Sequence, residues 1–187
     1  NHSMEFARAA AEVCAANGIH VRIFESLRPT PELSFAVREY DCQAGINVTA
    51  SHNPKEYNGY KVYWSDGAQL PPQHAAAIAR ELEQIDIFTG IRRMEFDDAK
   101  AQGLIEIMGA ETDERFMSHV MAMVNDRESM AKVADTFHMV YTPFHGCGWK
   151  LVPEALRDLG VKHLHCVPEQ MVLDGSFPTV ESPNPEN

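Results

Sequence analysis

Hydrophobic and polar positions follow two periods along the chain, the 3.6-residue period of a helix and the two-residue period of a strand, and segments of the two kinds alternate. A helical period starts at Ser3, with Phe6, Ala10 and Val13 at helical spacing, and Gly18 ends it. Apolar residues then alternate with polar ones over residues 19–23, as in a strand. Thr30-Pro31 starts a second helix, because proline suits the first helical turn. A short apolar run over residues 46–50 predicts a buried strand.

Turn signals divide the next part of the chain. Asn58-Gly59 and Asp66-Gly67 are typical turn pairs, and the strand-like run 60–64 lies between them. Pro71-Pro72 predicts another helix start. The apolar side of that helix comprises Ala76, Ile78, Ala79 and Leu82.

The second half repeats the alternation of strands and helices. A strand is predicted over residues 105–108 and a helix over 111–124, followed by a polar stretch without periodicity. Strands at 140–142 and 164–167 enclose one more helix. This order predicts an α/β protein with a largely parallel sheet. We place a first domain at residues 1–130 and the beginning of a second at 131–187.

Composition and charge exclude several classes of function. The 187 residues carry a formal charge of -11, a surface that repels nucleic acid and anionic lipid, so neither is an expected partner. No apolar run approaches the ~20 residues of a membrane span, and no signal peptide is visible. The four cysteines are far apart in sequence and form no Cys-x-x-Cys pair. We therefore expect a cytoplasmic protein with reduced thiols.

The richest candidate chemistry lies between Gly45 and Lys61. Ligands of open α/β sheets bind beyond the carboxyl ends of strands, and Ser51 stands where the predicted strand ends. A serine beside His52, with Lys55 and Lys61 nearby, suits a nucleophile or a phosphate-bearing residue. The same residues also suit a plain turn between two strands, and the pattern alone leaves both interpretations open.

Two further clusters favour structural roles. His163, His165 and Cys166 share a predicted strand, but the sequence offers no second ligand cluster for a metal site. His145 and Cys147 lie in a glycine-rich turn after a strand, where the glycines permit tight backbone geometry.

The serine stretch resembles the active-site loop of the α-D-phosphohexomutases. Residues 49–54 (TASHNP), followed by 58–61 (NGYK), carry the resemblance. Residues 28–38 and 58–70 are most similar to the bacterial phosphoglucomutase/phosphomannomutase branch, and 141–148 (YTPFHGCG) resembles the start of that family's second domain. The resemblance implies a three-layer α/β/α sandwich with a mostly parallel mixed sheet, followed by the start of a second, similar α/β domain.

The resemblance also implies roles for individual residues. Ser51 would carry a phosphoryl group, and Lys61 would act as the general acid or base on the sugar hydroxyl, with His52 as a further catalytic residue. The expected phosphate-binding or substrate-binding residues are Asn53, Lys55 and Arg28. Mg²⁺ would bind to Ser51 through its phosphate oxygen, and glucose 1,6-bisphosphate would act as activator.

By the same resemblance, the expected reaction interconverts glucose 1-phosphate and glucose 6-phosphate through a phosphoserine and a hexose 1,6-bisphosphate. Phosphomannomutase and glucose 1,6-bisphosphate synthase remain as alternatives, as does a non-catalytic scaffold that retains the serine loop. The family's arginine-bearing loop and Asp-x-Asp-x-Asp-Arg metal loop are not found in this sequence. We therefore expect an inactive N-terminal fragment that needs the remaining domains of a full-length mutase.

Overall fold

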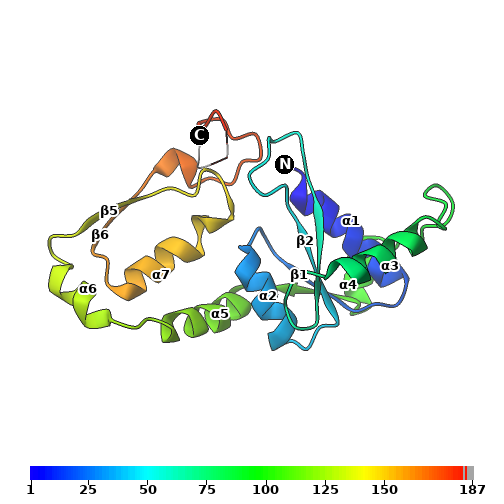
Figure 1. Cartoon of the computed structure of the whole chain (residues 1–187), viewed down its shortest axis with the longest axis horizontal. Coiled ribbons are helices and arrows are strands. Elements are labelled where there is room, and N and C mark those ends of the chain that lie inside the picture. Colours follow the sequence, from blue (N-terminus) through cyan, green and yellow to red (C-terminus); the bar gives the residue numbers. More distant parts are fainter. Residues whose placement is uncertain (183, 185–187) are drawn as a thin grey trace. The chain divides into compact units, whose positions relative to one another are not determined.

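The computed structural model describes residues 1–182 and 184, which form helices and strands in two compact units (Figure 1). The N-terminal unit comprises His2–Thr49 and Gly59–Gly109. The C-terminal unit comprises Asn1, Ala50–Asn58 and Ala110–Asn187. The mixture of helices with parallel strand pairs confirms the predicted α/β class.

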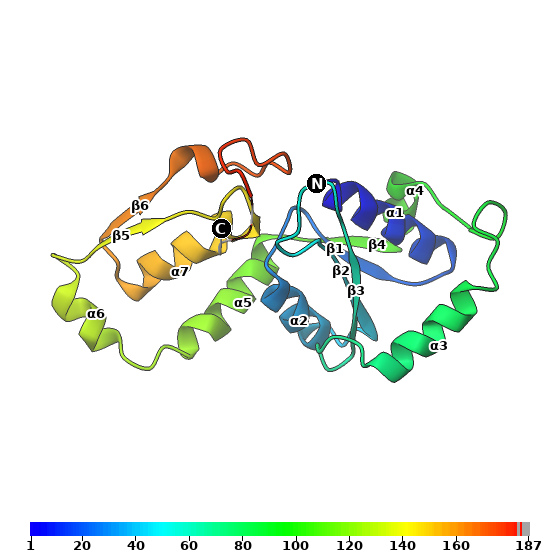
Figure 2. The same cartoon turned by 45° about the horizontal axis from the view of Figure 1, so that its top comes forward.

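The N-terminal unit contains two strand pairs and four helices. β1 pairs with β4 in parallel, and β2 pairs with β3 antiparallel (Figure 2). The elements are α1 (Ser3–Ala16), β1 (Val21–Phe24), α2 (Thr30–Glu39), β2 (Ala44–Val48), β3 (Tyr60–Trp64), α3 (Pro72–Leu82), α4 (Phe96–Ala101) and β4 (Ile105–Met108).

The core of this unit forms where α1 meets α4 and β4. Small residues on one face of α1 allow close packing, and Gly18, with φ of +76°, ends the helix as the sequence predicts. Met94 and Leu104 pack around the buried set from the sides. The buried members of the cluster are Ala11, Ala15, Phe96, Ala99 and Ile105.

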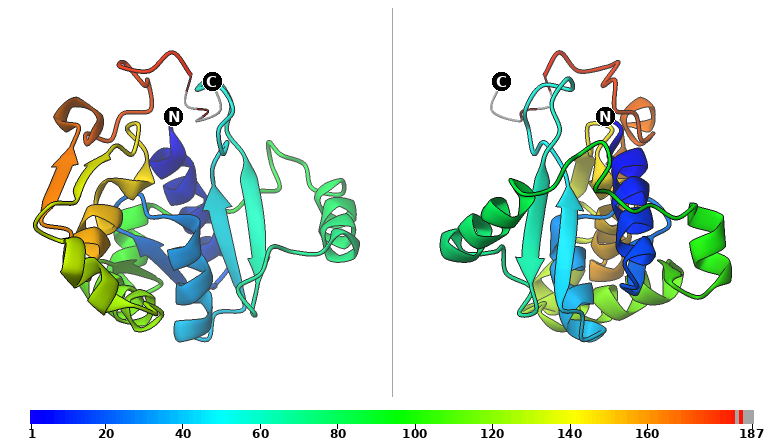
Figure 3. Two further views of the ribbon diagram at one scale, coloured as in Figure 1. Left: turned by 60° about the vertical axis from the view of Figure 1, so that its left-hand side comes forward. Right: turned by 90° about the vertical axis from the view of Figure 1, so that its right-hand side faces the viewer.

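The β2–β3 ribbon positions the serine-containing stretch. Its antiparallel register pairs Ala44 with Trp64 and Val48 with Tyr60, so the last residue of β2 stands opposite the first residue of β3 (Figure 3). β2 begins two residues earlier than predicted, and Gly45 is its one buried residue. A Cβ at Gly45 would lie 2.7 Å from a Val37 methyl carbon, so glycine permits α2 to pack directly on this strand.

Helix α3 forms where the sequence predicts it, but its apolar side is not part of a core. None of its residues is buried, and Ile78 and Leu82 are exposed. The apolar side that the sequence shows on this helix is therefore uncovered in the structure described. Helical periodicity predicts which residues share a face and does not determine what covers that face.

The C-terminal unit contains one parallel strand pair, β5 with β6, and α7 packs beside it (Figure 1). Lys150, just before α7, forms an ion pair of 2.5 Å with the buried Asp113 of α5. This bond joins α5 to the C-terminal unit, whereas the predicted domain boundary near residue 130 assigns it to the first domain. The elements are α5 (Ala110–Ala122), α6 (Arg127–Val133), β5 (His138–Tyr141), η1 (Cys147–Trp149), α7 (Leu151–Leu159), β6 (His163–Cys166) and η2 (Pro168–Gln170).

The four cysteines are free thiols, and each is partly buried. Burial raises the pKa of Cys14, Cys42 and Cys147 above the usual range of a thiol, so these side chains are weak nucleophiles at neutral pH. Across residues 1–182 and 184, every helix is too short or too polar to cross a lipid bilayer.

Candidate active site

The candidate site centres on the chain between β2 and β3, which we call the serine loop (Thr49–Gly59). The Thr49 amide donates a hydrogen bond of 3.0 Å to the Gly59 carbonyl oxygen, and this bond closes the base of the loop. A Cβ at Gly59 would approach the Thr49 carbonyl oxygen to 2.6 Å, so the closure requires glycine. Asn58-Gly59 is therefore the end of a long connection, and the prediction that this pair forms the tight turn is wrong.

Two turns inside the loop replace that single tight turn. The Asn53 amide donates to the Ala50 carbonyl oxygen at 3.1 Å, and the Tyr57 amide donates to the Pro54 carbonyl oxygen at 3.0 Å. Ser51 lies in the first turn with φ of +58°, in the left-handed region that non-glycine residues rarely adopt. Strained backbone of this kind is enriched at functional sites, so Ser51 is a candidate functional residue.

Residues 51–57 are all exposed, which leaves the Ser51 hydroxyl accessible from solvent. Its Oγ lies 3.3 Å from Nδ1 of His52. Ser51, His52 and Asn53 thus share one turn, as the sequence predicts. An accessible hydroxyl beside an imidazole is chemically able to accept a phosphoryl group and to hydrogen-bond the product.

Lys55 lies in the second turn of the loop and contacts the chain that follows η2. Its Nζ donates a hydrogen bond of 3.3 Å to the Ser176 carbonyl oxygen. The two segments enclose a pocket of about 180 Å³, which carries the positive charge of Lys55 on one wall. The pocket is lined by Pro54, Lys55, Glu56, Ser176, Phe177, Val180, Glu181 and Ser182.

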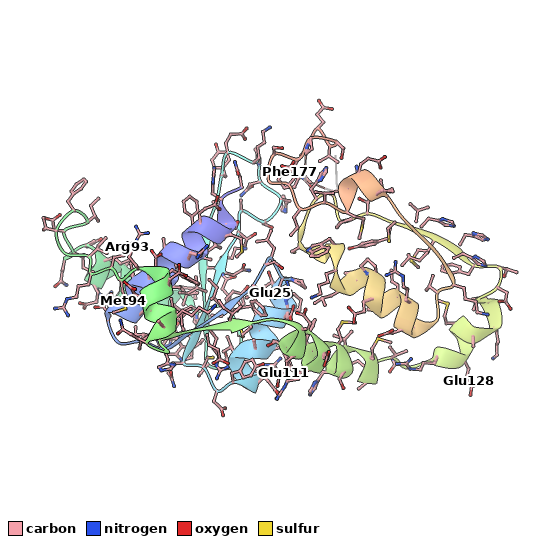
Figure 4. The ribbon with its side chains drawn as sticks, turned by 180° about the vertical axis from the view of Figure 1, so that it is seen from behind. Glu25, Arg93, Met94, Glu111, Glu128 and Phe177 are labelled. Carbon is pink, nitrogen blue, oxygen red and sulfur yellow. The ribbon has the colours of Figure 1, made fainter. Side chains whose placement is uncertain are left out.

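Arg28 occupies a different environment from Lys55. Its side chain is 2% exposed and lies at the start of α2, within the N-terminal unit. Its Nη2 lies 3.0 Å from a carboxylate oxygen of Glu25, which is labelled in Figure 4. Its Nε lies 3.8 Å from the fully buried Glu32. Nη1 also donates to the Ser26 hydroxyl at 2.6 Å. These bonds give Arg28 a structural role, and its binding of phosphate stays a prediction.

Lys61 belongs to β3 in the N-terminal unit and is half-buried. It stands opposite Asn47 of β2, whose side-chain amide donates to the Thr30 hydroxyl at 2.8 Å. A lysine suits proton transfer near neutral pH when burial or a neighbouring cation lowers its pKa. The role of Lys61 as general acid or base stays a prediction.

The residues present do not by themselves make a complete metal site. Within residues 1–182 and 184, no three His, Cys, Asp or Glu side chains lie close enough to hold a metal ion. Mg²⁺ takes about six oxygen ligands in near-octahedral geometry, and Ser51 with its phosphate would supply one of them. The expected binding of Mg²⁺ to Ser51 therefore stays a prediction.

Two models of one protein family match most of the chain. The family model described as phosphoglucomutase/phosphomannomutase, alpha/beta/alpha domain I, matches residues 1–87. The model for domain II of the same family matches residues 114–187. The chain belongs to the phosphoglucomutase/phosphomannomutase family. The two matches confirm the predicted resemblance, including the start of a second α/β domain.

Relatives of known name are similar to this family member over nearly all of its length. A phosphoglucomutase from Staphylococcus saprophyticus is 35% identical over 185 residues, which is 99% of this chain and 33% of that protein. A phosphoglucomutase from Staphylococcus aureus strain MRSA252 is 36% identical over 191 residues, with 99% and 32% covered. The chain therefore spans about a third of the length of these relatives.

A solved structure shows the same fold. A protein from Thermus thermophilus, provisionally named a phosphomannomutase, superposes with a TM-score of 0.69 at 23% identity. The superposition covers 94% of this chain and 36% of that one. It agrees with the α/β/α architecture of both family models.

Two residues near the site were not predicted as functional from the sequence. The Asp174 carboxylate accepts from the Ser176 hydroxyl at 2.7 Å and from its amide at 2.8 Å, and it so holds the chain that contacts Lys55. These two bonds lower the pKa of Asp174 below its usual range, and the bond from the Ser176 hydroxyl has the larger effect. Asp-Gly is a turn signal that sequence inspection can find. The buried His145 carries no local signal, because its partners lie 27 and 34 residues away.

Proposed function

We propose that the protein containing this chain interconverts glucose 1-phosphate and glucose 6-phosphate, with Ser51 as the phosphoryl carrier. The observation that carries the proposal is the exposed, left-handed Ser51 in a turn between β2 and β3. Membership of the phosphoglucomutase/phosphomannomutase family and the names of the Staphylococcus relatives support the choice of reaction. Interconversion of the corresponding mannose phosphates is the alternative substrate choice.

In the proposed reaction, phosphoserine 51 transfers its phosphoryl group to a free hydroxyl of the hexose phosphate. The bond between phosphorus and Oγ of Ser51 breaks, a bond between phosphorus and the sugar oxygen forms, and the sugar hydroxyl loses its proton. The product is a hexose 1,6-bisphosphate. Return of its other phosphoryl group to Oγ then regenerates phosphoserine 51 and releases the isomeric monophosphate.

Each loop residue has a proposed part in these two transfers. Phosphoryl transfer asks the protein mainly for positioning and neutralisation of charge. The exposed Lys55 supplies positive charge four residues from Ser51. His52 and Asn53 share the first turn with Ser51, and we propose that they hydrogen-bond the phosphate. Lys61 is proposed to take up and return the proton of the sugar hydroxyl.

Mg²⁺ and glucose 1,6-bisphosphate are the proposed cofactor and activator. A divalent cation bound at a phosphoserine neutralises charge that accumulates on the phosphoryl oxygens. The ligands beyond Ser51 would come from outside the described residues. A hexose 1,6-bisphosphate would load Ser51 with its first phosphoryl group.

The proposal is tested by phosphopeptide mapping of the full-length protein after incubation with glucose 1,6-bisphosphate and Mg²⁺. We expect close to one phosphate per protein, on the peptide that contains Ser51, and none on that peptide in Ser51→Ala. An unlabelled Ser51 in folded protein would contradict the proposal and favour a scaffold that retains the serine loop. Initial rates with glucose 1-phosphate and mannose 1-phosphate then determine the sugar.

A further inference from the structure

His145 is a buried titratable residue that the proposed reaction does not use. The residue is 3% exposed and lies in the turn between β5 and η1. Its Nδ1 lies 2.9 Å from the Val172 carbonyl oxygen, and its Nε2 lies 2.8 Å from Oγ1 of Thr179. Both partners belong to the coil that follows η2, which we call the 172–179 segment. One imidazole therefore ties both ends of that segment.

The hydrogen-bond partners determine which ring nitrogen of His145 carries the proton. A carbonyl oxygen only accepts, so Nδ1 must donate to Val172. Oγ1 of Thr179 accepts from the side-chain amide nitrogen of Gln170 at 3.1 Å, so the threonine hydroxyl can donate its own proton to Nε2 of His145. The Gln170 amide oxygen in turn accepts from the Thr142 hydroxyl at 2.5 Å. A neutral imidazole with its proton on Nδ1 gives every group in this series of hydrogen bonds a partner of the right kind.

The turn that carries His145 has an unusual backbone conformation. Phe144 and His145 have φ of +47° and +62°, two successive non-glycine residues in the left-handed region. The His145 amide donates to the Gln170 carbonyl oxygen at 2.9 Å, and the Phe144 amide donates to the Thr142 hydroxyl at 3.1 Å. Such strain persists where surrounding bonds over-determine the conformation, so the turn is built to present this imidazole.

The segment tied by His145 is the one that contacts the serine loop. Ser176 lies midway along it, and the Ser176 carbonyl oxygen accepts the hydrogen bond from Lys55. Phe177, labelled in Figure 4, lines the pocket beside Lys55. It makes an edge contact with the His145 ring at 6.5 Å between centroids. Displacement of the 172–179 segment would therefore move the partner of Lys55 and one wall of the pocket.

We propose that His145 is a positioning residue: through its bonds to Val172 and Thr179 it holds the 172–179 segment, and thereby Lys55, in the geometry that binds the substrate's phosphate. This inference rests on the proposed function for its effect on catalysis. The tie between His145 and the segment is independent of that function. The proposal therefore makes one structural prediction and one kinetic prediction.

The structural prediction is tested on the full-length protein without any substrate. In ¹⁵N-histidine NMR, the wild-type His145 ring is expected as the neutral tautomer with its proton on Nδ1. In His145→Phe, hydrogen exchange of amides 172–179 is expected to rise about tenfold, the factor that corresponds to about 1.4 kcal/mol, a typical net loss for hydrogen bonds. Thr179→Val leaves His145 in place and is expected to raise exchange at the Thr179 end alone.

The kinetic prediction distinguishes positioning from a general loss of structure. His145→Phe is expected to raise KM for the hexose phosphate about tenfold while kcat falls less than about threefold. His145→Asn keeps a donor near the Nδ1 position, so it should restore protection at the Val172 end and part of the KM. Thr179→Val is expected to raise KM by a smaller factor. Thr136→Val, at a hydroxyl that bonds locally to the Val133 carbonyl, serves as the matched control.

The outcomes separate this inference from the proposed function. Unchanged exchange of residues 172–179 in both His145→Phe and Thr179→Val, or an Nδ1 that carries no proton, would overturn the tie. Raised exchange with an unchanged KM would overturn the positioning role. A wild-type protein without phosphate on Ser51 would refute the proposed function, whereas the exchange and tautomer measurements would still decide the tie. If His145→Phe does not fold, the exchange rates of Thr179→Val and the tautomer of His145 in the wild type decide whether His145 ties the 172–179 segment.

Discussion

The serine loop and the 172–179 segment both lack helix and strand, yet they are held in different ways. Residues 51–57 of the loop are exposed, and the two bonds that shape its turns join residues three apart. The 172–179 segment is held at both ends by the buried His145, 27 and 34 residues earlier in the chain. The contrast fits the two proposals, in which an accessible loop carries the reacting groups and a buried residue fixes the chain beside it.

The largest expected effect tests whether the loop acts by chemistry alone. Ser51→Ala is expected to reduce mutase activity of the full-length protein roughly 10⁴-fold or more, because it removes the phosphoryl acceptor. The same substitution should change the free energy of unfolding by less than about 0.5 kcal/mol, since Ser51 is exposed. Ser65→Ala, at an exposed serine after β3, is the control. Comparable activity of Ser51→Ala and the wild type would remove the chemical role from the loop.

The next effect contrasts a buried cation with an exposed one. Arg28→Met is expected to lower the free energy of unfolding by about 3 kcal/mol, because the buried Glu32 loses a positive partner. Lys55→Met should change it by less than about 0.5 kcal/mol and raise KM for the hexose phosphate. Urea unfolding and initial-rate kinetics on both variants provide the comparison. Equal destabilisation by the two substitutions would show that exposure does not separate their roles.

A third effect concerns the closed base of the serine loop. Gly59→Ala is expected to lower the free energy of unfolding by about 1–3 kcal/mol, because its Cβ would lie 2.6 Å from the Thr49 carbonyl oxygen. Gly18→Ala has no neighbour within 4 Å and would be strained only by its φ of +76°, for about 1 kcal/mol. Thermal unfolding of both variants would show whether the close approach or the backbone conformation dominates.

The smallest effect is a pH dependence within the 172–179 segment. Because the pKa of Asp174 is lowered in the folded protein, its stabilising bonds are complete above the usual pKa of an aspartate. They are lost as pH falls through the lowered pKa. The Ser176 amide proton shift should therefore titrate in this acidic range in the wild type and stay constant in Asp174→Asn. Asp126, whose carboxylate holds the Ser129 amide at the start of α6, is the matched reference.

Sequence patterns predicted the elements that depend on near neighbours. The start of β3 at Tyr60, the proline-led starts of α2 and α3, and the stop at Gly18 follow from local propensity, and the structure confirms them. Patterns failed where the partner was not local. Asn58-Gly59 is a good turn pair by propensity, but its carbonyl instead closes an eleven-residue loop on Thr49.

The candidate site divides along the same line. The motif around Ser51 is contiguous, so the sequence alone identified the turn and the family to which the chain belongs. Residue type gave no sign that Arg28 is buried among carboxylates while Lys55 is exposed, because both are cations beside predicted loops. Burial is a property of the packed chain, and it determines how each cation contributes.

By itself, then, the sequence determined the class of fold, the order of its strands and helices to within a few residues, and the serine that is proposed to carry phosphate. These depend on backbone hydrogen bonds and side-chain propensities that act over a few residues. Only the tertiary structure brought His145 to Val172 and Thr179, and Lys55 to Ser176. Contacts between residues so far apart in sequence exist only after the loop entropy of the intervening chain has been overcome, and no local pattern records them.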